Sequence, residues 1–356
     1  MKILSTKNYS LPKIINIVRK KRSKKADVEK PVQEIIDSVR QNKDRALLAL
    51  TRKFDGVNLQ TLLVSRQEIE YAYSKETKEV ISAIKIAKKN IEKFHKENVK
   101  RKEASVATTP GVKVWREFRP IEKVGLYVPG GKAAYPSTVL MLAIPAKIAG
   151  CKEIILCVPP GKDGKVPSVV LVAADICGIS KIFKVGGAQA IAAMAYGTES
   201  IQKVSKIFGP GNSYVTTAKM LVYGEVDIDM PAGPSEVLVF ADKNANPSWV
   251  AADFLSQLEH GEDSQAILVT LFPSFAEKVI KEINEQAKKL LRQQIIKKSL
   301  EKSFVIIPQN EVQACEFIND YAPEHLEIVC KNETQILRKI NNAGSVFLGP
   351  YTSEPL

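Results

Sequence analysis

The chain has 356 residues, a formal net charge of +13 at pH 7 and charged side chains at 26% of positions. This length excludes one small module and fits two or three domains, and the composition is that of a folded globular protein. No stretch approaches the roughly 18 apolar residues of a membrane-spanning helix, and the N-terminus lacks the apolar core of a signal peptide. Five cysteines without metal-type spacing indicate reduced thiols, so we expect a cytoplasmic protein without a membrane partner.

The positive charge is confined to the first third of the chain. Residues 1–106 hold 26 basic and 13 acidic side chains, whereas residues 107–356 hold 26 of each. A basic arm around Arg19, Lys20 and Lys21 would attract phosphate, but neither interleaved aromatic residues nor a helix-turn-helix or RRM pattern accompanies it. The charge therefore does not favour nucleic-acid binding, since a lysine-rich face is usually just solvated.

Periodicity predicts a helical first third followed by alternating strands and helices. Apolar residues recur at three- and four-residue spacing over 30–54 and 66–102, which predicts two long helices. The expected strands are 124–128, 153–158, 182–185 and 204–208, then 235–240, 265–271, 304–307, 325–329 and 344–348. The expected helices are 136–149, 167–177, 187–196 and 212–223, then 247–259, 273–299, 311–319 and 333–341. This alternation predicts an α/β protein with two parallel-sheet units.

Three glycine-bearing turns lie between predicted strands and helices, at 127–131, 186–189 and 208–213. Helix N-termini at the carboxyl ends of parallel strands favour phosphate, which makes a nucleotide a candidate ligand. None of the turns is a full GxGxxG, however, and each alone is equally well explained as a tight turn.

Two further features carry candidate chemistry. Gln257 and His260 are three residues apart, so they share a helix face and offer an amide oxygen and an imidazole to a metal. For two such residues alone, an exposed helix end closed by Gly261 is the simpler interpretation. Glu324 and His325 stand at the start of a predicted strand, and the chain has only three histidines for acid/base work near neutral pH.

Taken together, these features resemble the histidinol dehydrogenase family, NAD-dependent zinc enzymes that complete histidine biosynthesis. The resemblance runs from about residue 25 to the last residue and rests on seven motifs in order. They are Val124-Gly-Leu-Tyr-Val-Pro-Gly-Gly131, Pro136-Ser-Thr-Val-Leu-Met141, Gly186-Gly-Ala-Gln-Ala-Ile191, Gly209-Pro-Gly-Asn-Ser-Tyr-Val215, Asp229-Met-Pro-Ala-Gly-Pro-Ser-Glu236, Ser256-Gln-Leu-Glu-His-Gly261 and Ala322-Pro-Glu-His-Leu326.

The resemblance implies a role for particular residues in two successive oxidations, alcohol to aldehyde and aldehyde hydrate to carboxylate. The implied NAD contacts are Tyr127, Gln189 and Asn212; the implied substrate contacts are Ser235, Gln257, His260 and His325; the implied zinc ligands are Gln257 and His260. His325 would take the alcohol proton, and Glu324 would activate the water that attacks the aldehyde.

The resemblance also implies two Rossmann-like units and a homodimer. We expect a basic arm at 1–25, a discontinuous domain of 26–126 and 235–356 that carries the metal and Glu-His site, and an inserted NAD-binding domain at 127–234. In the family, the segment resembling 347–355 continues into a small C-terminal domain with an Asp and a His that complete the zinc site, and this domain is absent from the printed sequence.

Three functions are compatible with these motifs. The first is histidinol oxidation, by this chain alone or completed by a separate C-terminal polypeptide. The second is oxidation of another amino alcohol or a sulfonated diol on the same scaffold. The third is a catalytically impaired relative that acts as a binding protein. The Glu324-His325 pair favours the first over the second, because it matches the histidinol enzymes directly.

Overall fold

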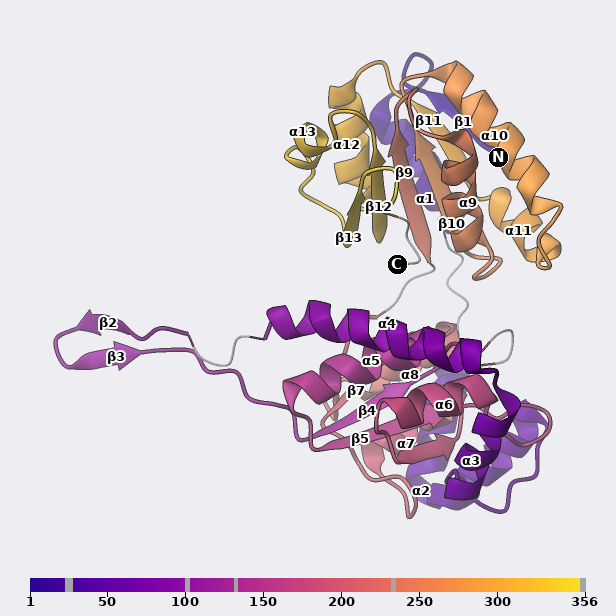
Figure 1. Cartoon of the computed structure of the whole chain (residues 1–356), viewed down its shortest axis with the longest axis vertical. Coiled ribbons are helices and arrows are strands. Elements are labelled where there is room, and N and C mark those ends of the chain that lie inside the picture. The colour runs from indigo at the N-terminus through magenta and orange to yellow at the C-terminus, as the bar shows by residue number, and fades with distance from the viewer. Residues whose placement is uncertain (23–27, 100–102, 131–133, 232–234, 353–356) are drawn as a thin grey trace. The chain divides into compact units, whose positions relative to one another are not determined.

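The computed structural model describes residues 1–22, 28–99, 103–130, 134–231 and 235–352. The chain forms two compact units, which we call unit 1 (Met1–Lys25 and Gly233–Leu356) and unit 2 (Ala26–Ala232). Each unit is a parallel β-sheet with helices on both faces, so the predicted α/β class with two sheet units is confirmed (Figure 1). Within the described ranges, no helix has the length and apolar character needed to cross a membrane.

Unit 2 contains a five-stranded sheet in the order β6-β5-β4-β7-β8, and every neighbouring pair is parallel. Its strands are β4 (Lys123–Tyr127), β5 (Glu153–Val158), β6 (Lys181–Lys184), β7 (Lys206–Phe208) and β8 (Asp227–Ile228). The central strands are almost wholly buried because helices cover both faces, which is why they read as uninterrupted apolar runs in the sequence.

The helices of unit 2 form two layers. One face is covered by α2 (Glu29–Asp55), α7 (Gly187–Tyr196) and α8 (Ser213–Val222). The other is covered by α3 (Arg66–Lys75), α4 (Lys78–Glu97), α5 (Pro136–Ala149) and α6 (Ser168–Ile176). The single helix expected over 66–102 is therefore wrong in one respect: the chain breaks at Glu76, which is extended, and the Thr77 side chain caps α4 by accepting from Val80 N.

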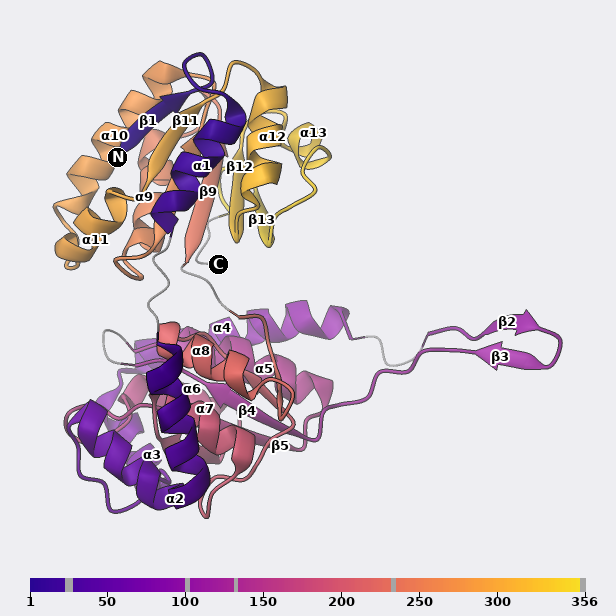
Figure 2. The same cartoon turned by 180° about the vertical axis from the view of Figure 1, so that it is seen from behind.

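Unit 1 contains a six-stranded parallel sheet in the order β1-β11-β10-β9-β12-β13. Its strands are β1 (Lys2–Ser5), β9 (Glu236–Ala241), β10 (Gln265–Val269), β11 (Phe304–Ile307), β12 (His325–Val329) and β13 (Ser345–Leu348). One face packs against α1 (Leu11–Arg22), α12 (Glu311–Tyr321) and α13 (Glu333–Leu337), and the other against α9 (Pro247–Leu258), α10 (Pro273–Ala287) and α11 (Gln293–Leu300) (Figure 2). The helix expected over 273–299 is divided between α10 and α11.

The two sheets share one topology. In unit 2 the chain adds β5 and β6 on one side of β4 and then β7 and β8 on the other side. In unit 1 it adds β10 and β11 on one side of β9 and then β12 and β13 on the other side, with β1 as an extra edge strand. Each sheet therefore has a topological switch point next to its first central strand, the place where open α/β sheets usually bind ligands.

The expected domain boundaries differ from these units. Residues 26–126 pack with 127–232, because α2 lies on α7 and α8, and α4 lies on α5. The described part of the expected basic arm, residues 1–22, is not a separate arm: β1 pairs with β11, and Ile14 and Val18 of α1 are fully buried in unit 1. Lys13, Arg19 and Lys20 are exposed on α1 whereas its apolar face is buried, so charge counting obscured that apolar face.

A β-hairpin was missed by the sequence analysis. Strands β2 (Val106–Thr109) and β3 (Val112–Val114) form a two-stranded antiparallel sheet with no third strand from the described part of the chain, and all seven of their residues are exposed. The two strands have only four and three residues, which is too few for the alternation of apolar and polar side chains to predict a strand.

Candidate active site

In unit 2, the predicted NAD residues surround the carboxyl ends of β4, β6 and β7. Tyr127 is the last residue of β4 and is 4% exposed, and its hydroxyl accepts a hydrogen bond from Gly187 N at 3.1 Å. Burial raises the pKa of Tyr127 to about 12, so the phenol stays protonated at neutral pH and its O–H remains a donor. The Gln189 side chain packs closely against Gly187 in the same turn. Gly187 has a φ of +66°, and a Cβ added to it would lie only 2.8 Å from Gln189 Oε1.

Asn212 stands at the N-terminus of α8, directly beyond β7. Its Oδ1 accepts from Tyr214 N at 3.0 Å and from Val215 N at 3.1 Å, so Asn212 is the N-cap of this helix. The capping explains why a polar residue follows the glycine turn at this position. The structure thus brings the turns containing Tyr127, Gln189 and Asn212 together at the switch point between β4 and β7.

In unit 1, the predicted residues gather at the amino ends of the strands rather than at their carboxyl ends. Ser235 immediately precedes β9, and Glu324 immediately precedes β12, which pairs with β9. The Glu324 carboxylate is exposed, and its Oε2 lies 3.4 Å from Glu236 N, which donates to it. His325 is half-buried, with its ring centroid 6.0 Å from that of Phe347. An acid, an imidazole and a hydroxyl therefore lie together at the amino ends of β9 and β12.

Gln257 and His260 lie at this same end of the sheet, at the C-terminus of α9. The helix runs back along the sheet between the parallel strands β9 and β10, so its C-terminus lies at their amino ends. Gln257 is fully buried, and neither its Oε1 nor its Nε2 has a hydrogen-bond partner among the described residues. His260 is exposed just past the helix, and its backbone N donates to Gln257 O at 3.3 Å. An unsatisfied buried amide costs about 1–3 kcal/mol, which calls for a functional explanation.

A buried polar network, which the sequence did not predict, lies at the amino ends of β9 and β10. The Tyr321 hydroxyl lies 2.5 Å from Glu236 Oε2 and 2.8 Å from Gln265 Oε1, and all three side chains are at most 2% exposed. Glu236 opens β9 and Gln265 opens β10, so the network ties α12 to the amino ends of two strands. Glu236, Gln265 and Tyr321 lie in apolar runs that are 29 residues or more apart in the sequence, so no local sequence pattern predicts that they meet.

The donor set fits a divalent metal in part. The unpartnered Gln257 carbonyl oxygen and the exposed His260 imidazole are suitable ligands, and they lie near one helix end. Across the described ranges, no cluster of three or more His, Cys, Asp or Glu side chains is arranged to hold a metal ion. All five cysteines are free.

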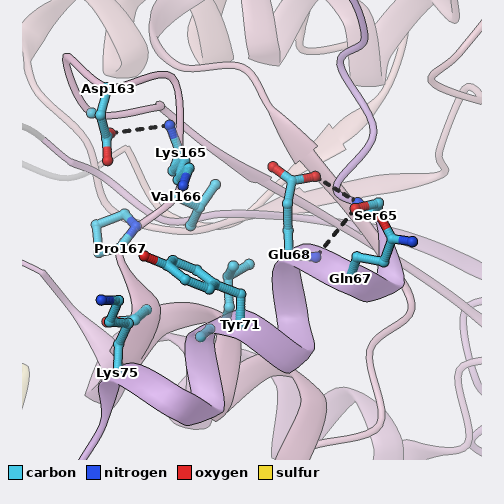
Figure 3. A pocket seen from close by; sticks show the side chains of 13 residues that line it. Ser65, Gln67, Glu68, Tyr71, Lys75, Asp163, Lys165, Val166 and Pro167 are labelled. Carbon is cyan, nitrogen blue, oxygen red and sulfur yellow. Dashed lines mark hydrogen bonds between the residues drawn. The ribbon is translucent and has the colours of Figure 1, made fainter.

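Unit 2 also has a hollow of about 540 Å³ between α3 and the segment that leads into α6 (Figure 3). The ammonium groups of Lys75 and Lys165 lie 5.0 Å and 4.6 Å from the ring centroid of Tyr71. Glu68 and Asp163 also line the hollow, so neither sign of charge dominates it. None of its lining residues belongs to the predicted site.

Comparison with protein families gives one match that spans nearly the whole chain. The family model described as histidinol dehydrogenase matches residues 18–356. This range contains both clusters and all seven motifs on which the resemblance rests.

Individual relatives agree with the family match. The histidinol dehydrogenase of Bacteroides thetaiotaomicron is 53% identical over 326 residues, which cover 91% of this chain and 76% of the relative. That of Methanocaldococcus jannaschii is 48% identical over 340 residues, covering 96% and 79%. The crystal structure of histidinol dehydrogenase from Elizabethkingia anophelis matches with a TM-score of 0.95 and 45% identity, covering 100% of this chain and 82% of that one.

Proposed function

Because the chain belongs to the histidinol dehydrogenase family, the oxidoreductases that oxidise histidinol in histidine biosynthesis, we propose that unit 2 binds NAD for this reaction in the cytoplasm. Tyr127, Gln189 and Asn212 would contact the cofactor at the switch point of the five-stranded sheet. The N-terminus of α7, for which the described residues provide no side-chain cap, and the protonated Tyr127 hydroxyl are suitable donors to the cofactor.

In unit 1, Ser235, Gln257, His260 and His325 would contact histidinol, and Glu324 and His325 would move the protons. His325 would take the alcohol proton in the first oxidation, which gives the aldehyde. Glu324 would take a proton from the water that adds to the aldehyde, so that the second oxidation gives the carboxylate. Bound NAD would accept the hydride that each oxidation releases. The observation that carries this proposal is the convergence of Glu324, His325 and Ser235 at the paired amino ends of β9 and β12.

We propose zinc as a further component, with Gln257 Oε1 and His260 as the ligands from the described residues. The unpartnered buried amide of Gln257 supports this assignment. A bound Zn²⁺ would supply a fixed positive charge that orients the imidazole and amine of the substrate.

An NADH-forming assay on histidinol tests the proposed function. The purified chain should form two NADH for each histidine produced, and the metal content should follow activity. Activity that depends on an added C-terminal polypeptide would support a two-chain enzyme. Turnover of another amino alcohol or a sulfonated diol, without turnover of histidinol, would overturn the substrate assignment. Absence of turnover with every one of these substrates, even with the C-terminal polypeptide added, would overturn the assignment of this chain as an enzyme.

Replacing Gln257 tests the zinc ligand without relying on activity. Gln257→Met keeps the side-chain length and removes the unsatisfied amide, so we expect the metal-free protein to gain about 1 kcal/mol in free energy of unfolding. Zinc affinity, measured by competition with a chromophoric chelator, should fall at least about tenfold because a ligand is lost. Unchanged zinc affinity would contradict the role of Gln257 as a ligand.

We further propose that the enzyme is a homodimer and that the hairpin of β2 and β3 contributes to its interface. Val106, Val112 and Val114 are 61%, 47% and 52% exposed, and Trp115 and Phe118 beyond the hairpin are 50% and 57% exposed. A second copy would cover these apolar side chains and supply the contacts that an isolated hairpin lacks.

Substitution of Val114 tests the proposed dimer interface. Val114→Asp should weaken dimerisation at least about tenfold, because it places a charge in an apolar contact. Sedimentation equilibrium over a range of concentrations measures the change. Leu291→Asp is the matched control, since Leu291 is a fully exposed apolar residue of unit 1 outside the hairpin. A wild-type monomer, or equal dimer affinity in the Val114→Asp variant, would contradict this proposal.

A further inference from the structure

Both backbone polar groups of Gly209, in the turn between β7 and α8, are held by side chains. The Lys219 ammonium donates to Gly209 O at 2.9 Å, and Gly209 N donates to Asp229 Oδ2 at 2.6 Å. Lys219 also forms an ion pair with Asp229 Oδ1. We call this arrangement of Lys219, Asp229 and Gly209 the Gly209 clamp.

The Gly209 clamp is built from three separate elements. Lys219 lies in α8 and is 2% exposed, whereas Asp229 directly follows β8, and its N donates to Ile207 O of β7 at 3.0 Å. A buried lysine is costly unless it is paired and hydrogen-bonded, and here both conditions are met. The clamp therefore fixes the position of the turn relative to α8 and to the edge of the sheet.

Gly209 couples this clamp to the proposed NAD contacts. Its φ is +130°, and a Cβ there would lie far inside the contact distance of Tyr127 O, so the Gly209 backbone packs directly against the end of β4. Asn212 caps α8 three residues later. A shift of Gly209 would therefore move both Tyr127 and Asn212, two of the three residues that we assign to NAD.

We propose that Lys219 and Asp229 are positioning residues for NAD binding, an inference that rests on the function proposed above. They touch neither the cofactor nor the reacting atoms in this role. They hold the turn in the one conformation in which the Tyr127 hydroxyl and the Asn212 helix end present their hydrogen-bonding groups together. Supporting residues of this kind hold the binding groups close to the geometry that tight binding requires.

Kinetic analysis of Lys219→Met and Asp229→Asn, in the protein otherwise unchanged, tests the clamp. We expect the KM for NAD to rise at least about tenfold in each variant, while the KM for histidinol changes less than about threefold. The double variant should be no worse than Lys219→Met by itself, because the two residues act as one unit. Hydrogen exchange at the Gly209 amide, which donates to Asp229, should accelerate in both single variants.

Lys206→Met is the matched control. Lys206 forms a 2.8 Å ion pair with Asp227 across β7 and β8, next to the clamp but without a hydrogen bond to the turn. This variant should leave the KM for NAD unchanged. If Lys219→Met fails to fold, Asp229→Asn remains informative, because it keeps the size of the side chain and removes the negative charge that pairs with Lys219.

Direct NAD titration of Tyr127→Phe and Asn212→Ala separates the clamp from the proposed NAD site. Lower affinity in these two variants, together with unchanged affinity in Lys219→Met and Asp229→Asn, would overturn the clamp alone. Unchanged affinity in Tyr127→Phe and Asn212→Ala would overturn the NAD site itself. Equal increases in the KM for NAD and for histidinol in the clamp variants would indicate a general structural role and overturn positioning.

Discussion

Glu324→Gln is expected to slow the second oxidation by about 10²- to 10⁴-fold, the usual contribution of a general base. The amide keeps the size of the carboxylate and an oxygen that accepts from Glu236 N, so the amino edge of β9 and β12 should stay intact. It cannot take a proton from water. The first oxidation, assigned to His325, should change less than about fivefold. Rapid-quench experiments should therefore find histidinal accumulating after one NADH per active site.

Supplying histidinal directly gives an independent measurement of the same step. The Glu324→Gln variant should oxidise histidinal as slowly as it completes the reaction from histidinol. Glu316→Gln, at an exposed position of α12 in the same unit, should behave like the unmodified chain. Equal losses in both oxidations would show that Glu324 is not specific to the water-dependent step.

Gly209→Ala is expected to lower the free energy of unfolding by about 3–5 kcal/mol. Two penalties combine at this residue: a φ of +130°, which L side chains rarely adopt, and overlap of the new Cβ with the Tyr127 carbonyl. The carbonyl belongs to the central strand β4 and cannot move aside as a flexible side chain would. Urea unfolding followed by circular dichroism measures the loss, and NAD affinity of the remaining folded protein should fall with it.

Gly224→Ala separates the two penalties. Gly224 has a φ of +101°, but a Cβ there would meet no atom within 4 Å. This variant should lose only about 1–2 kcal/mol, the cost of the backbone conformation alone. Similar losses in Gly209→Ala and Gly224→Ala would mean that the close approach to Tyr127 contributes nothing.

Periodicity predicted most elements because their physical signal is local. Buried parallel strands are continuous apolar runs between turns, so β5, β11 and β12 were predicted at their observed bounds. Errors arose where the deciding interaction was not periodic. The Thr77 cap divides α3 from α4 within one amphipathic pattern, and β1 exists only because β11, some 300 residues away, offers a parallel edge.

Motif order in the sequence was sufficient to identify the family, and helix-end residues such as Asn212 could be placed from local turns. The sequence could not assign residues 26–126 to unit 2, because that assignment depends on which helices pack together. Nor could it reveal the Gly209 clamp or the network of Glu236, Gln265 and Tyr321, since buried polar groups find their partners across the fold. The sequence by itself determined most of the helices and strands and the motifs that identify the family. Only tertiary packing decided which polar groups meet, because a hydrogen bond or ion pair depends on distance in space, which sequence separation does not define.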